Sequence, residues 1–200
     1  MANPNGNAAL FFDLGGTLVR LNESREIPLD PNGNIVVELL PNVAEKLRPM
    51  HDYLMFVVTN QAGITRGRLT AEEVEAALKE LDAQLGDILS GWQICPHTDD
   101  DHCECRKPKG GMITELADMY GVDLACSTMV GDQEVDLGSF NTGERAHYGS
   151  GANLKGSASG GNGLDDRTGL RTGTLQGSAF RPRDNCPVRA VVPDIQAQLP

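Results

Sequence analysis

The sequence is poor in aromatic residues, in long apolar runs and in positive charge. Phe, Trp and Tyr make up 4% of the 200 residues, so a folded core must be built mainly from aliphatic side chains. No stretch approaches the roughly 18 consecutive apolar residues that a membrane-spanning helix needs. The first ten residues, MANPNGNAAL, also lack the basic and apolar segments of a secretion signal. We therefore expect a cytoplasmic protein without a membrane partner.

The scarcity of positive charge limits the partners further. The chain has 17 basic and 28 acidic residues, a net charge of −11, whereas nucleic acid is bound mainly through Lys and Arg that neutralise phosphates. The composition therefore argues against nucleic acid as a partner, and no pattern in the sequence indicates an oligomeric state. Any anionic substrate must be met by local positive charge or by a metal ion.

Three short apolar segments are present, and they have the pattern of buried strands. Residues 8–12, 53–58 and 127–130 each end at a polar turn. Between them, a capping box opens a helical pattern over residues 70–86, and a second helical pattern over residues 113–120 ends at a glycine. Strands that alternate with helices are typical of an α/β fold in which helices cover both faces of a parallel sheet, giving three layers.

The composition changes in the last third of the chain. Eleven of the 23 glycines lie between Gly138 and Gly177, and large apolar residues are isolated there. Because so little apolar surface cannot offset the entropy cost of ordering the backbone, we expect much of residues 137–187 to be loop-like or disordered. Residues 1–136 would then form the folded core, and residues 137–200 a Gly-rich end of the same domain.

Polar side chains follow each of the three predicted strands. In an open α/β sheet, ligands bind in the crevice at the carboxyl ends of the strands, so we expect these side chains to converge. Taken alone, each is most often a turn residue, and it is their combination in this chain order that indicates a site. They are Asp13 after the first strand, Thr59 and Asn60 at the second, and Asp132 and Asp136 after the third.

The residue types indicate phosphoryl transfer at a metal site. The carboxylates of Asp13 and Asp132 suit Mg²⁺, which prefers oxygen ligands and accepts phosphate oxygens beside them. Lys107, in the basic cluster that begins at Arg106, and the hydroxyl of Thr59 could donate to the transferring phosphoryl group. Asp13 could then attack phosphorus and form an aspartyl-phosphate.

These segments resemble the motifs of the haloacid dehalogenase superfamily. Residues 11–18, FFDLGGTL, resemble its first motif, usually DxDGT. Residues 57–64, VVTNQAGI, resemble the second motif of the branch that contains heptose bisphosphate phosphatase and histidinol-phosphate phosphatase. The lysine motif and the final acidic motif are matched at residues 105–109 and 129–136. The resemblance covers residues 8–136, about two thirds of the chain, and implies a Rossmann-like fold without a large cap.

Residue by residue, the resemblance implies a phosphoric monoester hydrolase. Asp13 becomes the nucleophile, and magnesium is held by Asp13, Asp132 and the backbone carbonyl of Gly15. The expected substrate is a small phosphorylated metabolite of carbohydrate metabolism, most readily a sugar phosphate. The remaining assignments are phosphate contacts at Thr59, Asn60 and Lys107, a substrate contact at Arg106, and a supporting carboxylate at Asp136.

Gly15 is the main departure from the superfamily pattern, because it stands where the second aspartate of the first motif usually protonates the leaving group. A positioned acid or base is typically worth about 10² to 10⁴ in rate. We therefore expect a slow enzyme, or one that takes leaving groups which depart without a proton, such as acyl or anomeric phosphates. The alternatives are a catalytically silent module that binds phosphate ligands, a histidinol-phosphate phosphatase and a polynucleotide-end phosphatase.

Four soft or borderline metal ligands lie in two close pairs before the basic cluster. The spacing C-x-H-x5-C-x-C suits a tetrahedral Zn²⁺ with no open position for catalysis, and the resembled branch carries such a loop. His102 offers an alternative to His97 as the nitrogen ligand. We expect this zinc loop, residues 95–105, to hold Arg106 and Lys107 in position. Its expected ligands are Cys95, His97, Cys103 and Cys105.

Overall fold

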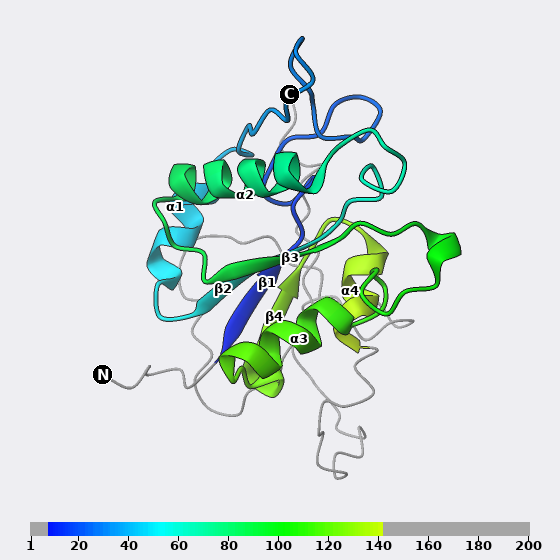
Figure 1. Cartoon of the computed structure of the whole chain (residues 1–200). Helices are drawn as coiled ribbons and strands as arrows, with labels where there is room; N and C mark the ends of the chain where they lie inside the picture. The colour runs from blue at the N-terminus through cyan, green and yellow to red at the C-terminus, as the bar shows by residue number, and fades with distance from the viewer. Residues whose placement is uncertain (1–7, 142–200) are drawn as a thin grey trace, which may run out of the picture.

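β1 (Ala9–Phe12) lies inside a four-stranded parallel sheet in the computed structural model, which describes residues 8–141 (Figure 1). The strand order is β3-β2-β1-β4, and every neighbouring pair is parallel. The other strands are β2 (Leu54–Asn60), β3 (Gly91–Cys95) and β4 (Thr128–Val130). Because all four strands run the same way, their carboxyl ends meet at one edge of the sheet.

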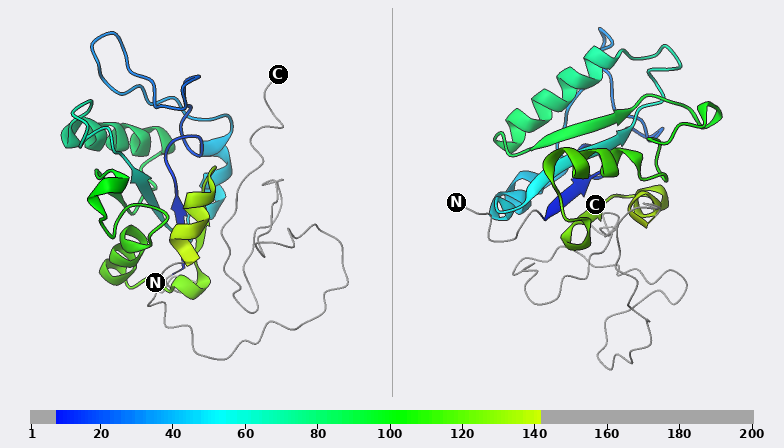
Figure 2. Two further views of the ribbon diagram at one scale, coloured as in Figure 1. Left: turned by 90° about the vertical axis from the view of Figure 1, so that its right-hand side faces the viewer. Right: turned by 60° about the horizontal axis from the view of Figure 1, so that its bottom comes forward.

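Helices cover both faces of this sheet, as Figures 1 and 2 show. α1 (Val43–Leu47) and α2 (Ala71–Leu85) lie on one face, and α3 (Gly111–Tyr120) and α4 (Glu134–Asn141) lie on the other. Successive side chains of a strand point to opposite faces, so one strand supplies both halves of the core. The predicted α/β fold with three layers and a central parallel sheet is confirmed. The connections include the single-turn 3₁₀ helices Arg48–Met50, Asp99–Asp101 and Leu124–Cys126.

The two halves of the core are aliphatic, with a few aromatic side chains at the centre of the sheet. Leu10 and Phe12 of β1 belong to the cluster that contains the leucines of α2. Ala9 and Phe11 belong to the cluster under α3 and α4, where Phe11 stacks on Phe56 with the ring centroids 5.4 Å apart. Burial of these side chains on both faces fixes β1 in the sheet and so fixes the residue that follows it.

The helix that the capping box predicts is present as α2. The hydroxyl oxygen of Thr70 accepts a hydrogen bond from the Glu73 backbone N–H at 3.1 Å, and the Thr70 N–H donates to the Glu73 carboxylate at 2.7 Å. Gly86 ends the helix in the left-handed conformation, with φ 92°. This confirms the start and the end that the sequence pattern indicates.

Two elements differ from the sequence expectation. β3, with the sequence GWQIC, has no clear strand pattern and pairs with β2 along its length. α4 continues through residues 137–141, whereas the composition predicts a loop-like segment from residue 137 onward. The prediction is wrong for these five residues because Leu137 is buried in the core beside α3. The remainder of the segment 137–187 lies outside the described residues.

Between β1 and α1 the chain forms an extended loop rather than a large cap. Isolated bridges pair Val19 with Leu39 and Leu29 with Ile35, so the segment folds back on itself. Figure 1 shows this loop, in blue, leaving the carboxyl end of β1. Within the described part of the chain, no helix is long and apolar enough to cross a membrane.

Candidate active site

Asp13, Lys107 and Asp136 form a buried charged group at the carboxyl edge of the sheet. The Lys107 ammonium lies 2.5 Å from Asp13 Oδ1 and 2.6 Å from Asp136 Oδ1. It also donates to the backbone carbonyl of Val58 in β2, at 2.9 Å. Only 2% of the Lys107 side chain is exposed, so these three acceptors replace its hydration.

The environment of Asp13 opposes its ionisation. Burial raises the pKa of Asp13 to about 6; the positive charge of Lys107 acts against this rise, and the negative charge of Asp136 adds to it. One ammonium faces two carboxylates, so a further positive charge would favour the ionised form that a nucleophile needs.

Asn60 fixes the backbone of Lys107. Its side-chain amide donates to the Lys107 carbonyl at 3.1 Å, and its side-chain oxygen accepts from the Lys107 N–H at 3.0 Å. Both polar ends of the Asn60 amide are therefore used on the loop that carries the lysine. Its neighbour Thr59 is buried, and its hydroxyl accepts from the Gln61 amide at 3.0 Å, which leaves the hydroxyl proton available for a ligand.

Asp132 lies close to the other two carboxylates, but only one of its two carboxylate oxygens has a hydrogen-bond partner within residues 8–141. Its Oδ2 accepts from the Arg25 guanidinium at 2.6 Å, whereas its buried Oδ1 has no hydrogen-bond partner among the described residues. Gly16, with φ 82°, makes this approach possible, because a Cβ there would come within 2.6 Å of Asp132 Oδ2.

The three carboxylates fit a hard cation. Asp13, Asp132 and Asp136 each offer an oxygen, and these oxygens lie within 4.8 Å of one another. A buried carboxylate oxygen without a partner is costly unless a cation or a donor completes it, so the orphaned Oδ1 of Asp132 supports a Mg²⁺ site here. Asp136 is locked in place by the Gln133 N–H, which donates to its Oδ2 at 3.0 Å.

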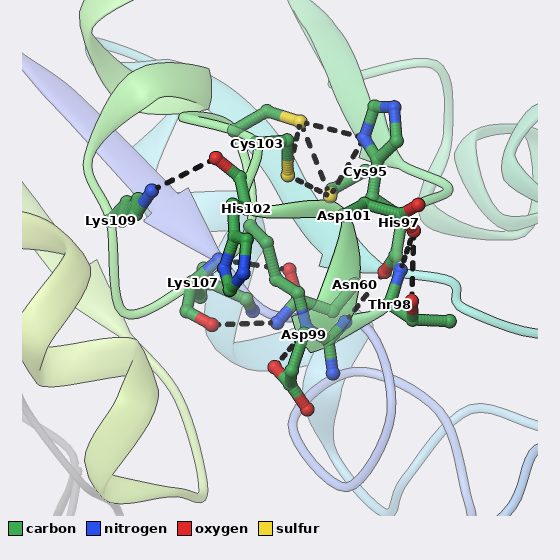
Figure 3. A network of polar contacts seen from close by, with 12 residues as sticks. Asn60, Cys95, His97, Thr98, Asp99, Asp101, His102, Cys103, Lys107 and Lys109 are labelled. Carbon is green, nitrogen blue, oxygen red and sulfur yellow. Dashed lines mark hydrogen bonds and ion pairs between the residues drawn. The ribbon is translucent and has the colours of Figure 1, made fainter.

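The cysteines and the histidine of the predicted zinc loop also converge (Figure 3). The Sγ atoms of Cys95, Cys103 and Cys105 are separated by 3.2 to 3.7 Å, and His97 Nδ1 lies 3.2 Å from Cys105 Sγ and 3.7 Å from Cys95 Sγ. A Zn–S bond of about 2.3 Å in a tetrahedron gives S···S edges of about 3.8 Å. The cluster is therefore close to the size that Zn²⁺ requires, and its nitrogen comes from His97 rather than His102.

The protonation state of the cysteines in this cluster depends on whether a metal ion is bound. Burial raises the pKa of Cys95 to about 12, with the neighbouring thiol of Cys105 acting in the same direction. A bound cation reverses this effect, because it stabilises the thiolate directly. Against the effect of burial, the pKa of Cys103 is lowered by hydrogen bonds from the neighbouring thiols and backbone, so the metal-free cluster holds its protons chiefly on Cys95 and Cys105. Metal binding would release these protons.

The loop that carries this cluster also places Arg106. The guanidinium donates to Asp99 Oδ1 at 2.7 Å and to the backbone carbonyl of His97 at 3.1 Å. The loop is tied to the segment after β2 by Thr65, whose hydroxyl donates to the Pro96 carbonyl at 2.7 Å. Arg106 is therefore held by both ends of the loop.

A cavity of about 710 Å³ opens over the buried charged group. Its wall includes Asp13, Lys107 and Thr59, together with four arginines. In a chain of net charge −11, this is the local positive charge that an anionic ligand needs. The arginines are Arg25, Arg66, Arg68 and Arg106.

Sequence reasoning missed some of these residues. Arg25 and Arg68 stand in segments without a recognisable motif, and only their charge could have drawn attention to them. Leu21 and Ile27 were missed too: a Cβ on Gly15 would meet Leu21 Cδ2 at 2.9 Å and Ile27 Cγ1 at 3.8 Å. The space in which the second aspartate of the superfamily's first motif would lie is therefore lined by apolar side chains.

Comparison with known proteins shows which family the chain resembles. The polynucleotide kinase 3 phosphatase family matches residues 8–142. A probable D-glycero-D-manno-heptose-1,7-bisphosphate 7-phosphatase of Thermoplasma volcanium is 31% identical over 136 residues, which span 66% of this chain and 89% of that protein. A D-glycero-beta-D-manno-heptose-1,7-bisphosphate 7-phosphatase of Pseudomonas aeruginosa is 45% identical over 84 residues, 40% of this chain and 47% of that protein. The second match thus spans about half of the relative.

A solved structure has the same fold. The D,D-heptose 1,7-bisphosphate phosphatase of B. bronchiseptica, complexed with magnesium and phosphate, superimposes with a TM-score of 0.57 at 26% identity, over 66% of this chain and 74% of that one. The resemblance expected from the motifs and the predicted class, phosphoric monoester hydrolases, are confirmed. The chain belongs to the polynucleotide kinase 3 phosphatase family, as a haloacid dehalogenase superfamily phosphatase that resembles the heptose bisphosphate phosphatases.

Proposed function

We propose that the protein is a magnesium-dependent phosphatase that hydrolyses a small phosphorylated metabolite, a sugar phosphate, through an aspartyl-phosphate on Asp13. The observation that carries this proposal is the buried contact of Asp13 with Lys107 beside two further carboxylates, at the wall of a cavity of about 710 Å³. The relatives named for heptose bisphosphate, and the neighbour that holds magnesium and phosphate, support the substrate class and the metal.

In the proposed reaction, a carboxylate oxygen of Asp13 attacks phosphorus and the bond to the leaving oxygen breaks. The Lys107 ammonium, held by Asn60 and Asp136, and the Thr59 hydroxyl donate to the phosphoryl oxygens. Mg²⁺, when bound, supplies charge neutralisation on the transferring group. Water then hydrolyses the aspartyl-phosphate, releases phosphate and restores the Asp13 carboxylate.

The ligands proposed for Mg²⁺ are the carboxylates of Asp13 and Asp132 and the backbone carbonyl of Gly15. Asp136 is proposed as a supporting residue, because its contacts are to Lys107 and to the backbone N–H of Gln133. The zinc cluster is proposed as structural, because its four protein ligands leave no open position. The cytoplasmic location expected from the sequence is kept as part of the proposal.

The domain organisation is also kept as a proposal. Residues 1–136 form the phosphatase core with the zinc loop, and residues 137–200 are a Gly-rich end of the same domain. The burial of Leu137 in the core supports an extension of the core a few residues beyond this boundary.

The hydrocarbon around Gly15 defines which substrates should react fastest. Residue 15 is a glycine with Leu21 and Ile27 beside it, so in this chain the position supplies no proton for the leaving group. In acyl and anomeric phosphates, the bond from phosphorus to the leaving oxygen breaks to release a carboxylate or a sugar hemiacetal oxyanion, which are less basic than an alkoxide, so these substrates depend least on an acid. We expect acetyl phosphate and sugar 1-phosphates to be turned over faster than the phosphate esters of primary alcohols.

The proposal is tested with purified protein, Mg²⁺ and a panel of sugar phosphates, histidinol phosphate and acetyl phosphate. Phosphate release should require Mg²⁺ and should fall by at least about 10³-fold in Asp13→Asn, which keeps the shape of the side chain and loses the nucleophile. Arg20→Gln, on the same loop but paired with Glu38 outside the cavity, is the matched control and should retain activity. Equal turnover by Asp13→Asn and the wild type would end the proposal.

Restoring the acid gives a second test. Gly15→Asp should raise turnover of alcohol phosphates by at least about tenfold, because a positioned acid is worth about 10² to 10⁴. The new Cβ displaces one methyl group of Leu21, so the double variant Gly15→Asp/Leu21→Ala provides the room if the single variant does not. No gain in either variant would mean that the low rate has another origin.

The rival functions have specific support. The matching family is that of the polynucleotide kinase 3 phosphatases, and this match favours a nucleic-acid end as substrate. Gly15 favours a silent module that binds phosphate ligands without turnover. Binding of inorganic phosphate without hydrolysis of any substrate in the panel would select the silent module.

A further inference from the structure

Arg25 contacts the carboxylate that we propose as a magnesium ligand. Its guanidinium lies 2.6 Å from Asp132 Oδ2, and 61% of its side chain is exposed. The wall of the cavity includes Arg25 but does not include Asp132. The guanidinium therefore covers this carboxylate from the side on which a metal ion and a phosphate group would enter.

The turn that carries Arg25 is built to hold it there. Arg25 has a left-handed backbone, with φ 58°, and its N–H donates to the Asn22 carbonyl at 2.9 Å. The side-chain oxygen of Asn22 accepts from the N–H groups of Ser24 and Glu26, at 2.9 and 3.0 Å. A non-glycine residue in this conformation is unfavourable unless its surroundings fix it, and these three hydrogen bonds do so.

The same turn is tied to the opposite side of the cavity. Glu26, next to Arg25, forms an ion pair of 2.8 Å with Arg68, which lies in the loop after β2. Arg25 reaches the segment after β4, so two consecutive residues link the β2 side and the β4 side of the site. Arg25, Glu26 and Arg68 lie outside the motifs that carry the family resemblance, whereas Asp132 belongs to the final acidic motif.

We propose that Arg25 and Mg²⁺ compete for Asp132, and that Arg25, once displaced, becomes a contact for the anionic substrate. This inference rests on the proposed function. Arg25 occupies Oδ2, whereas the partnerless Oδ1 is the oxygen open to a cation. Mg²⁺ on Oδ1 would draw on the negative charge that holds the guanidinium on Oδ2 and would repel that guanidinium at short range, so each cation weakens the binding of the other.

Displacement of Arg25 requires little rearrangement. An ion pair with one partner this exposed contributes little stability, because water competes for the guanidinium. The side chain already lies on the cavity wall with Lys107 and Arg106, so it can turn toward a phosphate without unpacking the core. Arginine also binds phosphate oxygens through two N–H groups at once, which gives the freed side chain a favourable partner.

The test uses Arg25→Asn, because asparagine tolerates the left-handed backbone and lacks the charge. Magnesium affinity is measured by calorimetry on the magnesium-free protein with its zinc content checked, and affinity for inorganic phosphate is measured at saturating Mg²⁺. We expect Arg25→Asn to bind Mg²⁺ about 3- to 10-fold more tightly and phosphate about 3- to 10-fold more weakly than the wild type. Arg20→Asn, which changes an arginine of the same loop that pairs with Glu38, should alter neither affinity.

The opposite signs of the two changes separate this role from a structural one, because a damaged loop would weaken both ligands together. Unchanged or weaker magnesium binding in Arg25→Asn overturns the competition, and unchanged phosphate binding overturns the substrate contact. The variant Asp132→Asn separates a failure of this inference from a failure of the proposed function. If it loses Mg²⁺ while Arg25→Asn matches the wild type, only this inference fails. If the wild type itself binds no Mg²⁺, the proposed function fails as well.

Discussion

At Lys107 a single ammonium group is shared by two buried carboxylates. The lysine is within 2.6 Å of both Asp13 and Asp136, and neither carboxylate has much access to water. With both acids ionised, the group would carry one uncompensated negative charge in a poorly solvated place. Burial raises the pKa of Asp13 to about 6, and the negative charge of Asp136 adds to the rise against the positive charge of Lys107. A metal ion would supply the positive charge that this group lacks.

This charge shortage predicts how stability depends on pH in the metal-free protein. The pKa of Asp13 is about 6 in the folded chain, against an ordinary value of 3.8, so its contribution to stability is fully present below pH 3.8 and is lost as the pH rises through 6. Relative to Asp13→Asn, which does not titrate, the wild type should lose about 2 to 3 kcal/mol between about pH 4 and 7. Denaturant unfolding of both proteins at several pH values measures this difference.

Asp30→Asn is the matched control for this pH series. Asp30 is a half-buried residue whose pKa is lowered by hydrogen bonds from Asn34, so its contribution is lost only as the pH falls, outside the window of Asp13. The stability difference between Asp30→Asn and the wild type should therefore stay constant from pH 5 to 7. A stability difference between the wild type and Asp13→Asn that stays constant over the same window would contradict the assigned environment of Asp13.

At the level of secondary structure, the loop between β3 and α3 connects the proposed zinc cluster to the candidate active site. Cys95 ends β3, and the three other cluster residues follow within ten positions. Arg106 and Lys107 come directly after the last cysteine, so any movement of the cluster is passed to them through one or two peptide units. The hydrogen bond from Arg106 to the His97 carbonyl adds a second connection.

The zinc assignment predicts the effect of removing one ligand. Cys103→Ser should reduce the bound zinc from one per chain to nearly none, because serine is a poor zinc ligand and three ligands hold the ion weakly. A loss of about 2 kcal/mol would lower the melting temperature by roughly 4 to 8 °C for a chain of this size. Elemental analysis and thermal unfolding give the two measurements.

His102→Asn serves as the control in this experiment. His102 has a left-handed backbone, φ 48°, that asparagine tolerates, and its side chain is not part of the metal-sized cluster. Its zinc content should equal that of the wild type. Full zinc binding by Cys103→Ser, or loss of zinc in His102→Asn, would show that the ligand set is wrong.

At the scale of the whole molecule, charge is distributed in two opposing ways. The chain as a whole carries −11, yet the cavity wall contains four arginines and a lysine. Four carboxylates, those of Asp13, Glu26, Asp99 and Asp136, lie on the same wall, so acidic and basic groups nearly balance there. A small anion in the cavity therefore meets a less negative environment than a long polyanion, which also meets the rest of an acidic chain. This difference supports the proposal of a small phosphorylated substrate.

This charge distribution predicts how a polymer end compares with a sugar phosphate as a substrate, and how salt changes hydrolysis of the polymer. A 3′-phosphorylated oligonucleotide should be hydrolysed at least about tenfold less efficiently than a sugar phosphate at low salt. Its kcat/KM should rise when the ionic strength increases from about 0.01 M to 0.15 M, because the Debye length falls from about 30 Å to about 8 Å. An oligonucleotide that reacts faster than the sugar phosphates, and is weakened by salt, would favour the polynucleotide-end function.

The sequence by itself determined the convergence of Asp13, Thr59 and Asp132, because each follows a buried strand and parallel strands end at one edge. It also determined α2, whose cap and leucine spacing are local signals, and the pairwise spacing of the cluster ligands. These features depend on neighbours in the chain, and periodicity and turn chemistry record them directly.

Only the tertiary structure decided that Arg25 lies on Asp132, a contact between residues 107 positions apart. It also decided that GWQIC pairs with β2, that residues 137–141 continue a helix over the core, and that Leu21 fills the space beside Gly15. The physical reason is that such contacts are chosen by the packing of distant segments. Burial and charge at the meeting point then outweigh the weak preferences of each segment alone.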